Sequence, residues 1–108
     1  MDSLELRTIQ AEQSDLDVKC WPHSRGRETI YQTGLQLTQL AGKLATIAEI
    51  LAQGDIPDWE VLDKEVIPDL LIVSARLAND RKVSLGGAFN ARLAELTKHF
   101  SETDNSQD

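Results

Sequence analysis

The chain has 108 residues and is poor in aromatic residues, cysteine and proline. Aromatic residues make up only 5% of the sequence, so a core has to be built from Leu, Ile, Val and Ala. Such a core suits packed helices, because Leu and Ala favour helices whereas strands favour aromatic and β-branched residues. The single cysteine, Cys20, excludes a disulfide within the chain. We therefore expect a reducing compartment.

Several kinds of segment are also absent. No charged stretch leads into an apolar one at the N-terminus, so the sequence shows no signal peptide. The apolar runs end well short of the roughly 18 residues that a membrane span needs. No Gly-rich phosphate loop, zinc-type Cys/His pattern or serine nucleophile elbow occurs. We expect a cytoplasmic protein with no membrane partner.

The net charge is −7, with 27% charged and 41% apolar residues. These proportions are those of an ordinary globular domain. An acidic balance argues against a nucleic-acid partner, because such binding depends on Lys and Arg that neutralise phosphates. It does not exclude a nucleotide that arrives with its phosphates complexed by a divalent cation.

Apolar side chains recur at steps of three and four along the chain, which is the period of a helix. The expected helices cover residues 3–18, 28–53, 55–66, 69–80 and 84–100. We therefore predict an all-α fold of four to five helices, in a single domain over residues 1–100. Residues 101–108 have no large apolar side chain and are expected to form a disordered acidic tail.

Local signals set the expected helix ends. Gly54 should end the second helix, Asp55 should cap the third, and Ser84 should cap the last. Pro68 lacks an amide hydrogen and its ring crowds the carbonyl of Lys64. A kink or break is therefore expected there.

The second expected helix is apolar on more than one side. Its stripe contains leucine, isoleucine and alanine side chains at positions 37, 40, 41, 44, 47, 48 and 51, and small residues crowd a neighbouring side. A helix that is apolar on two faces has to be covered on two sides. A chain of this length cannot supply both covers, so we predict a homo-oligomer.

Two acids invite a metal hypothesis. Glu65 and Asp69 are four residues apart and share a face if the helix persists past Pro68. Two carboxylates are enough for Mg²⁺, which keeps several waters and also binds substrate phosphates. Acids near a helix start are equally explained by the helix dipole. The Cys20-x-x-His23 pair lacks a second pair of ligands, and we interpret it as structural.

The order of these elements resembles that of the MazG-like, all-α nucleoside triphosphate pyrophosphohydrolases over residues 4–100. The resemblance is carried by the segment that ends in the Trp21 loop, by LQLTQLAGKLATIAEIL, by EVIPDLLIVSARLAND and by VSLGGAFNARLAEL. It implies a MazG-like helical bundle completed by oligomerisation, as a dimer or tetramer, with a nucleotide as ligand.

The resemblance also implies a magnesium site that this chain lacks in part. Family members carry E-x-x-E on the long helix and E-x-x-D on the next, and these acids bind Mg²⁺ for hydrolysis between the α- and β-phosphates. Aligned on Gly42, the first pair falls on Leu40 and Lys43. Aligned on Asp69, the second pair falls on Val66 and Asp69. Three of the four acids are therefore replaced.

Three hypotheses follow. In the first, catalysis is lost or altered, the protein is a nucleotide-binding or interaction module, and Lys43 replaces the metal by pairing with Asp69. In the second, an active Mg²⁺-dependent enzyme uses a relocated site. Its acids would be Glu65, Asp69 and either Glu49 or Asp80, with Lys43, Arg76, Arg92 or Lys98 at the phosphates. In the third, an acidic helical oligomer binds a partner protein.

Overall fold

The computed structural model describes residues 3–20 and 27–106, and every regular element within them is helical. The elements are α1 (Ser3–Cys20), α2 (Arg27–Ala52), α3 (Trp59–Val61), the π-helical turn η1 (Leu62–Val66), α4 (Ile67–Arg81) and α5 (Leu85–Ser106). The predicted all-α fold is confirmed. Helix α5 continues over residues 101–106, where we expected the tail to begin.

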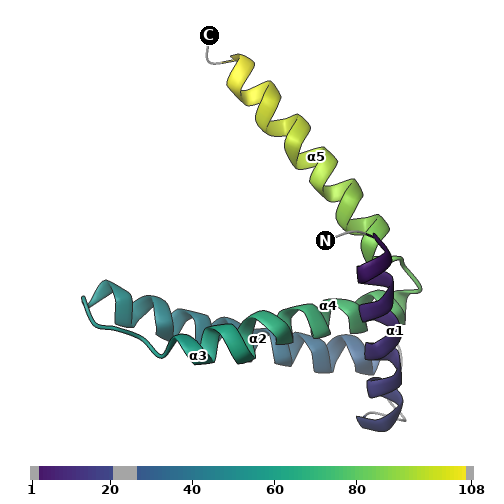
Figure 1. Cartoon of the computed structure of the whole chain (residues 1–108), viewed down its shortest axis with the longest axis horizontal. Coiled ribbons are helices and arrows are strands. Elements are labelled where there is room, and N and C mark those ends of the chain that lie inside the picture. Colours follow the sequence, from purple (N-terminus) through teal and green to yellow (C-terminus); the bar gives the residue numbers. More distant parts are fainter. Residues whose placement is uncertain (1–2, 21–26, 107–108) are drawn as a thin grey trace.

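The helices form an open V (Figure 1). Helix α2 and the continuous rod α3–η1–α4 lie antiparallel and make one arm, and α1 crosses the end of this arm against α4. Helix α5 leaves from that same end and makes the other arm. The radius of gyration is 17.1 Å, compared with about 13 Å for a compact domain of this length. The chain is therefore far more extended than a self-contained globule.

Gly54 ends α2 as predicted. Its φ of 83° lies in the left-handed region. Its amide donates to the Leu51 carbonyl at 3.0 Å, and the amide of Asp55 donates to the Ile50 carbonyl at 3.1 Å. This is the Schellman arrangement, which satisfies the last carbonyls of a helix.

The next helix begins later than predicted, because Asp55 still belongs to the end of α2 through its amide. Asp58 is the cap instead, and its side chain accepts a hydrogen bond from the Glu60 amide at 3.0 Å. Pro57 is buried just before this cap. The expected role of Asp55 was wrong.

Pro68 neither breaks nor ends the helix. The preceding residues form the π turn η1, in which the Ile67 amide donates to the carbonyl of Leu62, five residues earlier. The wider turn changes the hydrogen-bond register just before a residue that has no amide hydrogen to contribute. Helix α4 then continues to Arg81. We expected a kink or break: the chain stays helical, so it is not broken, but the π turn interrupts the regular α-helical hydrogen bonding just before the proline.

A small core lies where α1, α2 and α4 meet. Its buried apolar side chains are Leu6, Leu40, Ile47, Val66, Val73 and Ala75. Thr29 and Thr33 of α2 are buried with them. The Thr33 hydroxyl donates to the Thr29 carbonyl at 2.8 Å, which satisfies this polar group within its own helix.

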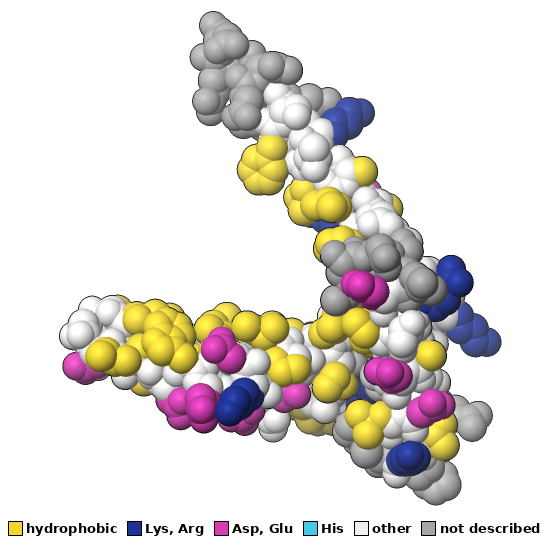
Figure 2. Space-filling model, in the orientation of Figure 1, with side chains coloured by type: hydrophobic (Ala, Val, Ile, Leu, Met, Phe, Trp, Pro, Cys, Tyr) yellow, Lys and Arg dark blue, Asp and Glu magenta, His cyan; other side chains and the backbone are white. Residues whose placement is uncertain are grey.

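The predicted two-sided character of α2 is visible in its burial. Leu40 and Ile47 face the core, whereas Leu37, Leu44 and Leu51 are exposed. Figure 2 shows apolar side chains along the edge of the arm that faces α5, and others on the side of α5 that faces the arm. The inside of the V is therefore its apolar side.

Two amide side chains join α1 to the turn between α4 and α5. Asn79 Nδ2 donates to the Gln10 carbonyl and to Gln13 Oε1, both at 2.9 Å. Gln10 Nε2 donates to the Val83 carbonyl at 3.0 Å and to Asn79 Oδ1 at 3.2 Å. Gln10 Oε1 accepts from the Leu85 amide at 2.8 Å. We call this network the amide clamp.

The same turn contains a strained residue. Lys82 has a φ of 57°, and the Val83 amide donates to the Ala78 carbonyl at 2.9 Å, so α4 ends in a second Schellman arrangement. Ser84 then caps α5 as predicted, because its hydroxyl accepts from the Gly87 amide at 3.1 Å. The left-handed position that Lys82 occupies at the end of α4 normally carries glycine, because a Cβ there costs about 1 kcal/mol.

Lys82→Gly is therefore expected to raise the free energy of unfolding by about 1 kcal/mol. The measurement is urea denaturation followed by circular dichroism. Lys82→Ala is the matched control, since it removes the same charge but keeps the Cβ. An equal gain in the alanine variant would show that charge, and not backbone strain, sets the cost.

Candidate functional site

A cleft of about 260 Å³ lies between α1, α2 and α4. Its lining residues are Leu16, Gln36, Gln39, Leu40, Lys43, Asp69, Ile72 and Val73. The α2 residues lie on one side because positions 36, 40 and 43 follow the helical steps of four and three. Asp69 and Val73 are one turn apart on α4 in the same way. The cleft therefore has an apolar floor and four polar side chains.

Lys43 provides the positive charge of the cleft, and it is held by an acid. Its Nζ lies 3.1 Å from Glu65 Oε1, in an ion pair whose side chains are 43% and 52% exposed. We expected Asp69 to be the partner, and the ion pair with Glu65 corrects this. The π turn η1 contains Glu65, and the changed register there gives the 65 and 69 positions different neighbours.

Asp69 is the one acid among the eight lining residues. Within residues 3–20 and 27–106, no three Asp, Glu, His or Cys residues come together in a way that could hold a metal ion. Leu40 and Val66, which the sequence resemblance would align with two of the acids, are both buried in the core. The residues present therefore do not fit a four-acid magnesium centre.

Gln36 carries the clearest sign of an unfilled polar site. Its Oε1 atom is buried in the cleft region and accepts no hydrogen bond from any residue that the structure describes. A buried acceptor without a donor costs roughly 1–3 kcal/mol. The oxygen lies below the surface of the cleft, so its cost falls on the stability of the helix pair.

Arg76 is placed away from the cleft. It is only 2% exposed, and its Nη2 donates to Gln32 Oε1 at 2.7 Å, so it joins α4 to α2 inside the bundle. This hydrogen bond connects the two helices. Arg76 is not among the residues that line the cleft.

The other candidates are dispersed. Arg92 lies on α5, where it pairs with Glu95 at 2.9 Å, and Lys98 lies further along the same helix. Glu49 is exposed near the end of α2, and Asp80 lies at the end of α4. None of these four residues lines the cleft.

His99 contacts the Phe100 ring edge-on, with ring centroids 6.0 Å apart. His23 and the side chain of Cys20 lie outside the described residues.

Sequence reasoning singled out Lys43 and Asp69 but missed the two glutamines. Gln36 lies seven residues before Lys43, which places both on one face of a helix. That spacing was the available signal. It was overlooked because glutamine is a common solvent-facing residue, and only the crossing of α1 over this face encloses it.

Comparisons with protein-family models, with curated proteins and with solved structures give no match to this chain. In the described ranges, none of the helices combines the length and apolar character that crossing a lipid bilayer requires.

Gln36→Leu is expected to raise the free energy of unfolding by about 1 kcal/mol in the absence of ligand, because it removes the unpaired buried acceptor. Urea denaturation tests this. Gln39→Leu, on the exposed rim of the same cleft, is the control and should leave stability within about 0.5 kcal/mol of the parent. A loss of stability in Gln36→Leu would mean that a water molecule already satisfies its oxygen.

Proposed function

We propose that this protein is a MazG-like helical module that does not use the family's magnesium chemistry and instead holds a nucleotide-type ligand in the α1–α2–α4 cleft. The observation that carries this proposal is the content of the cleft. Lys43 and Asp69, which fall on two of the four acid positions of the resemblance, line one cavity together with the unsatisfied Gln36.

The size of the cleft suggests that the base of a nucleotide, and not its phosphates, would occupy it. Its volume of about 260 Å³ lies just below the roughly 300–1,000 Å³ of ordinary small-molecule sites. Such a cavity suits a nucleobase on the apolar side chains of Leu40, Ile72 and Val73. Any phosphates would extend toward solvent past Lys43.

Lys43 would bind a phosphate only by leaving Glu65. The ion pair is half-exposed, and pairs of this kind contribute about 0–1 kcal/mol. Exchange of the carboxylate for a phosphate therefore costs little. In the resting protein, Glu65 neutralises the charge that Lys43 brings to a position where the family has an acid.

A second candidate function has its own observation. Much of the apolar surface of the chain is exposed, including Leu37 and Leu44 on α2 and Phe89 and Leu93 on α5. Exposed apolar surface on this scale marks an interaction site. We therefore propose that the protein works as a homo-oligomer in which a second copy covers this apolar surface. The alternative is that a different protein covers it.

Hydrolysis is tested directly by measuring Mg²⁺-dependent pyrophosphate release from a panel of nucleoside triphosphates. The expected result is no release above the buffer blank, because one acid in the cleft cannot form the four-acid centre. Turnover that disappears in Asp69→Ala would contradict this and would support a relocated metal site with Glu65.

Ligand binding is tested by isothermal titration with nucleosides, nucleoside monophosphates and nucleoside triphosphates. Lys43→Met should weaken binding of the phosphorylated ligands by about tenfold and leave nucleosides unaffected, since only phosphates would contact its charge. Equal weakening of both classes would show that Lys43 shapes the cleft and does not bind phosphate. No binding of any ligand would leave the interaction module as the better hypothesis.

A further inference from the structure

Helix α5 presents an apolar stripe to solvent. Phe89, Leu93, Leu96 and Phe100 follow one another at steps of four, three and four, which places them on one face. Their exposures are 46%, 51%, 38% and 64%. Every residue from 87 to 101 is exposed, so the chain provides no cover for this face. Most helical stability in proteins comes from tertiary packing of an amphipathic face, and this face has none within the described residues.

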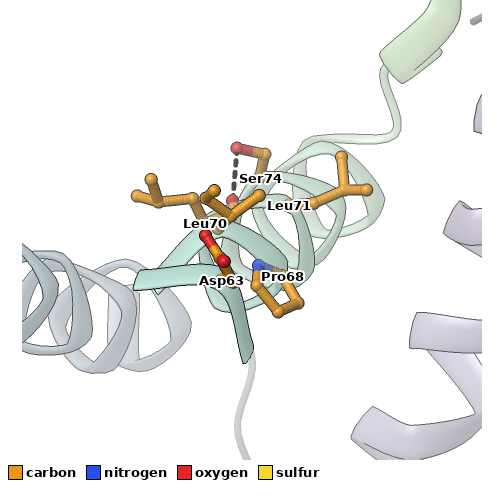
Figure 3. A pocket seen from close by; sticks show the side chains of 6 residues that line it. Asp63, Pro68, Leu70, Leu71 and Ser74 are labelled. Atoms are coloured by element: carbon orange, nitrogen blue, oxygen red, sulfur yellow. Dashed lines mark hydrogen bonds between the residues drawn. The ribbon is translucent and has the colours of Figure 1, made fainter. Parts of the chain in front are cut away.

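A shallow apolar surface, which we call the groove, lies along η1 and α4. Ile67, Pro68, Leu70, Leu71 and Ser74 line a hollow of about 550 Å³ that begins at Asp63 (Figure 3). The Ser74 hydroxyl donates to the Leu70 carbonyl at 2.8 Å, so this polar group is satisfied inside the helix. A second hollow, lined by Leu6, Leu71, Ser74, Leu85 and Phe89, continues the groove to the base of α5.

The groove and the stripe have matching lengths. Asp63 to Ser74 and Phe89 to Phe100 each span eleven residue steps, or about 16 Å at 1.5 Å per residue. The groove residues Ile67, Leu70, Leu71 and Ser74 also recur at helical spacing. The apolar stripe on α5 and the groove therefore have the same length.

Only Phe89, at the start of the stripe, lies beside the groove residues Leu71 and Ser74 of its own chain. The amide clamp fixes the start of α5, because Gln10 Oε1 accepts from the Leu85 amide at 2.8 Å and Gln10 Nε2 donates to the Val83 carbonyl at 3.0 Å. The turn before α5 is short and closed by the Schellman arrangement at Lys82. These hydrogen bonds hold the start of α5 in the orientation that leaves the V open.

The exposed area is large enough for such a dimer. The chain exposes 8103 Å², whereas a compact monomer of 12.0 kDa exposes about 6,000 Å². The excess is about 2,100 Å² per chain, or about twice that for two chains. This falls in the range of about 2,000–5,000 Å² that obligate dimers bury.

We propose that two copies of this chain exchange α5, each seating its Phe89–Leu93–Leu96–Phe100 stripe in the α4 groove of the other. The exchange rests on the proposed homo-oligomer and specifies its interface. Because each chain carries both the stripe and the groove, the contact is self-complementary and closes as a two-fold dimer. The apolar interior of the V becomes the dimer core.

The first test is the mass of the full-length protein by light scattering behind a sizing column. The parent is expected to be a dimer. Leu93→Glu on the stripe and Leu70→Glu in the groove should each weaken dimerisation on the order of a hundredfold or more, because each buries an unpaired carboxylate. Both side chains are exposed within one chain, so neither substitution disturbs the α1–α2–α4 core.

The matched control is Ala91→Glu, which adds the same charge to the opposite side of α5 and should remain a dimer. The decisive experiment mixes Leu93→Glu with Leu70→Glu. One of the two stripe–groove contacts is then unmodified. It is the contact between the stripe of the Leu70→Glu chain and the groove of the Leu93→Glu chain. A heterodimer of intermediate affinity is expected, although neither variant dimerises alone. Recovery of this species also shows that both variants are folded.

Three results would overturn the exchange. A monomeric parent protein would remove both the exchange and the homo-oligomer. A dimer that survives Leu93→Glu but dissociates in Leu44→Glu would place the interface on α2 and leave the homo-oligomer standing. Dissociation of Ala91→Glu, or no heterodimer in the mixture, would show that the stripe does not meet the groove.

Discussion

The arrangement of this protein depends on the amide clamp formed by Gln10 and Asn79. These two side chains join segments 69 residues apart and contribute five hydrogen bonds to α1, the end of α4 and the start of α5. Each neutral bond of this kind contributes about 0.5–1.5 kcal/mol. None of these side chains is charged, so salt and pH should have little effect on the strength of the clamp. The clamp fixes α1 across the arm and α5 away from it.

An open V follows, and with it a thin core. The core of the described residues has six buried Leu, Ile, Val and Ala side chains, whereas rows of leucine and phenylalanine on α2 and α5 remain exposed. A compact monomer would cover such rows with its own helices. Here the geometry of one turn prevents α5 from folding back. The surplus apolar surface is the physical reason for proposing that the functional unit contains more than one chain.

The cleft combines a changed charge pattern with an ordinary helical framework. Where the MazG-like resemblance expects acids, the chain has Leu40 and Val66 in its core and Lys43 at the cleft. The Lys43–Glu65 ion pair keeps the local charge balanced without a cation. This ion pair leaves no unpaired positive charge on Lys43. It does not supply the Lewis acid that hydrolysis of a phosphoanhydride by this family requires. A ligand-binding role is therefore the proposal that agrees with the residues present.

The sequence by itself determined the all-α class, the stop at Gly54, the cap at Ser84 and the two-sided character of α2. Each depends on residues within a turn or two of one another, and periodicity and capping report on that range. The partner of Lys43, the burial of Arg76 and the Gln36 cleft were decided only by the tertiary structure. They depend on the crossing angle of helices and on contacts between residues about 20 to 75 positions apart. No local pattern in the sequence encodes which of several helical faces will meet.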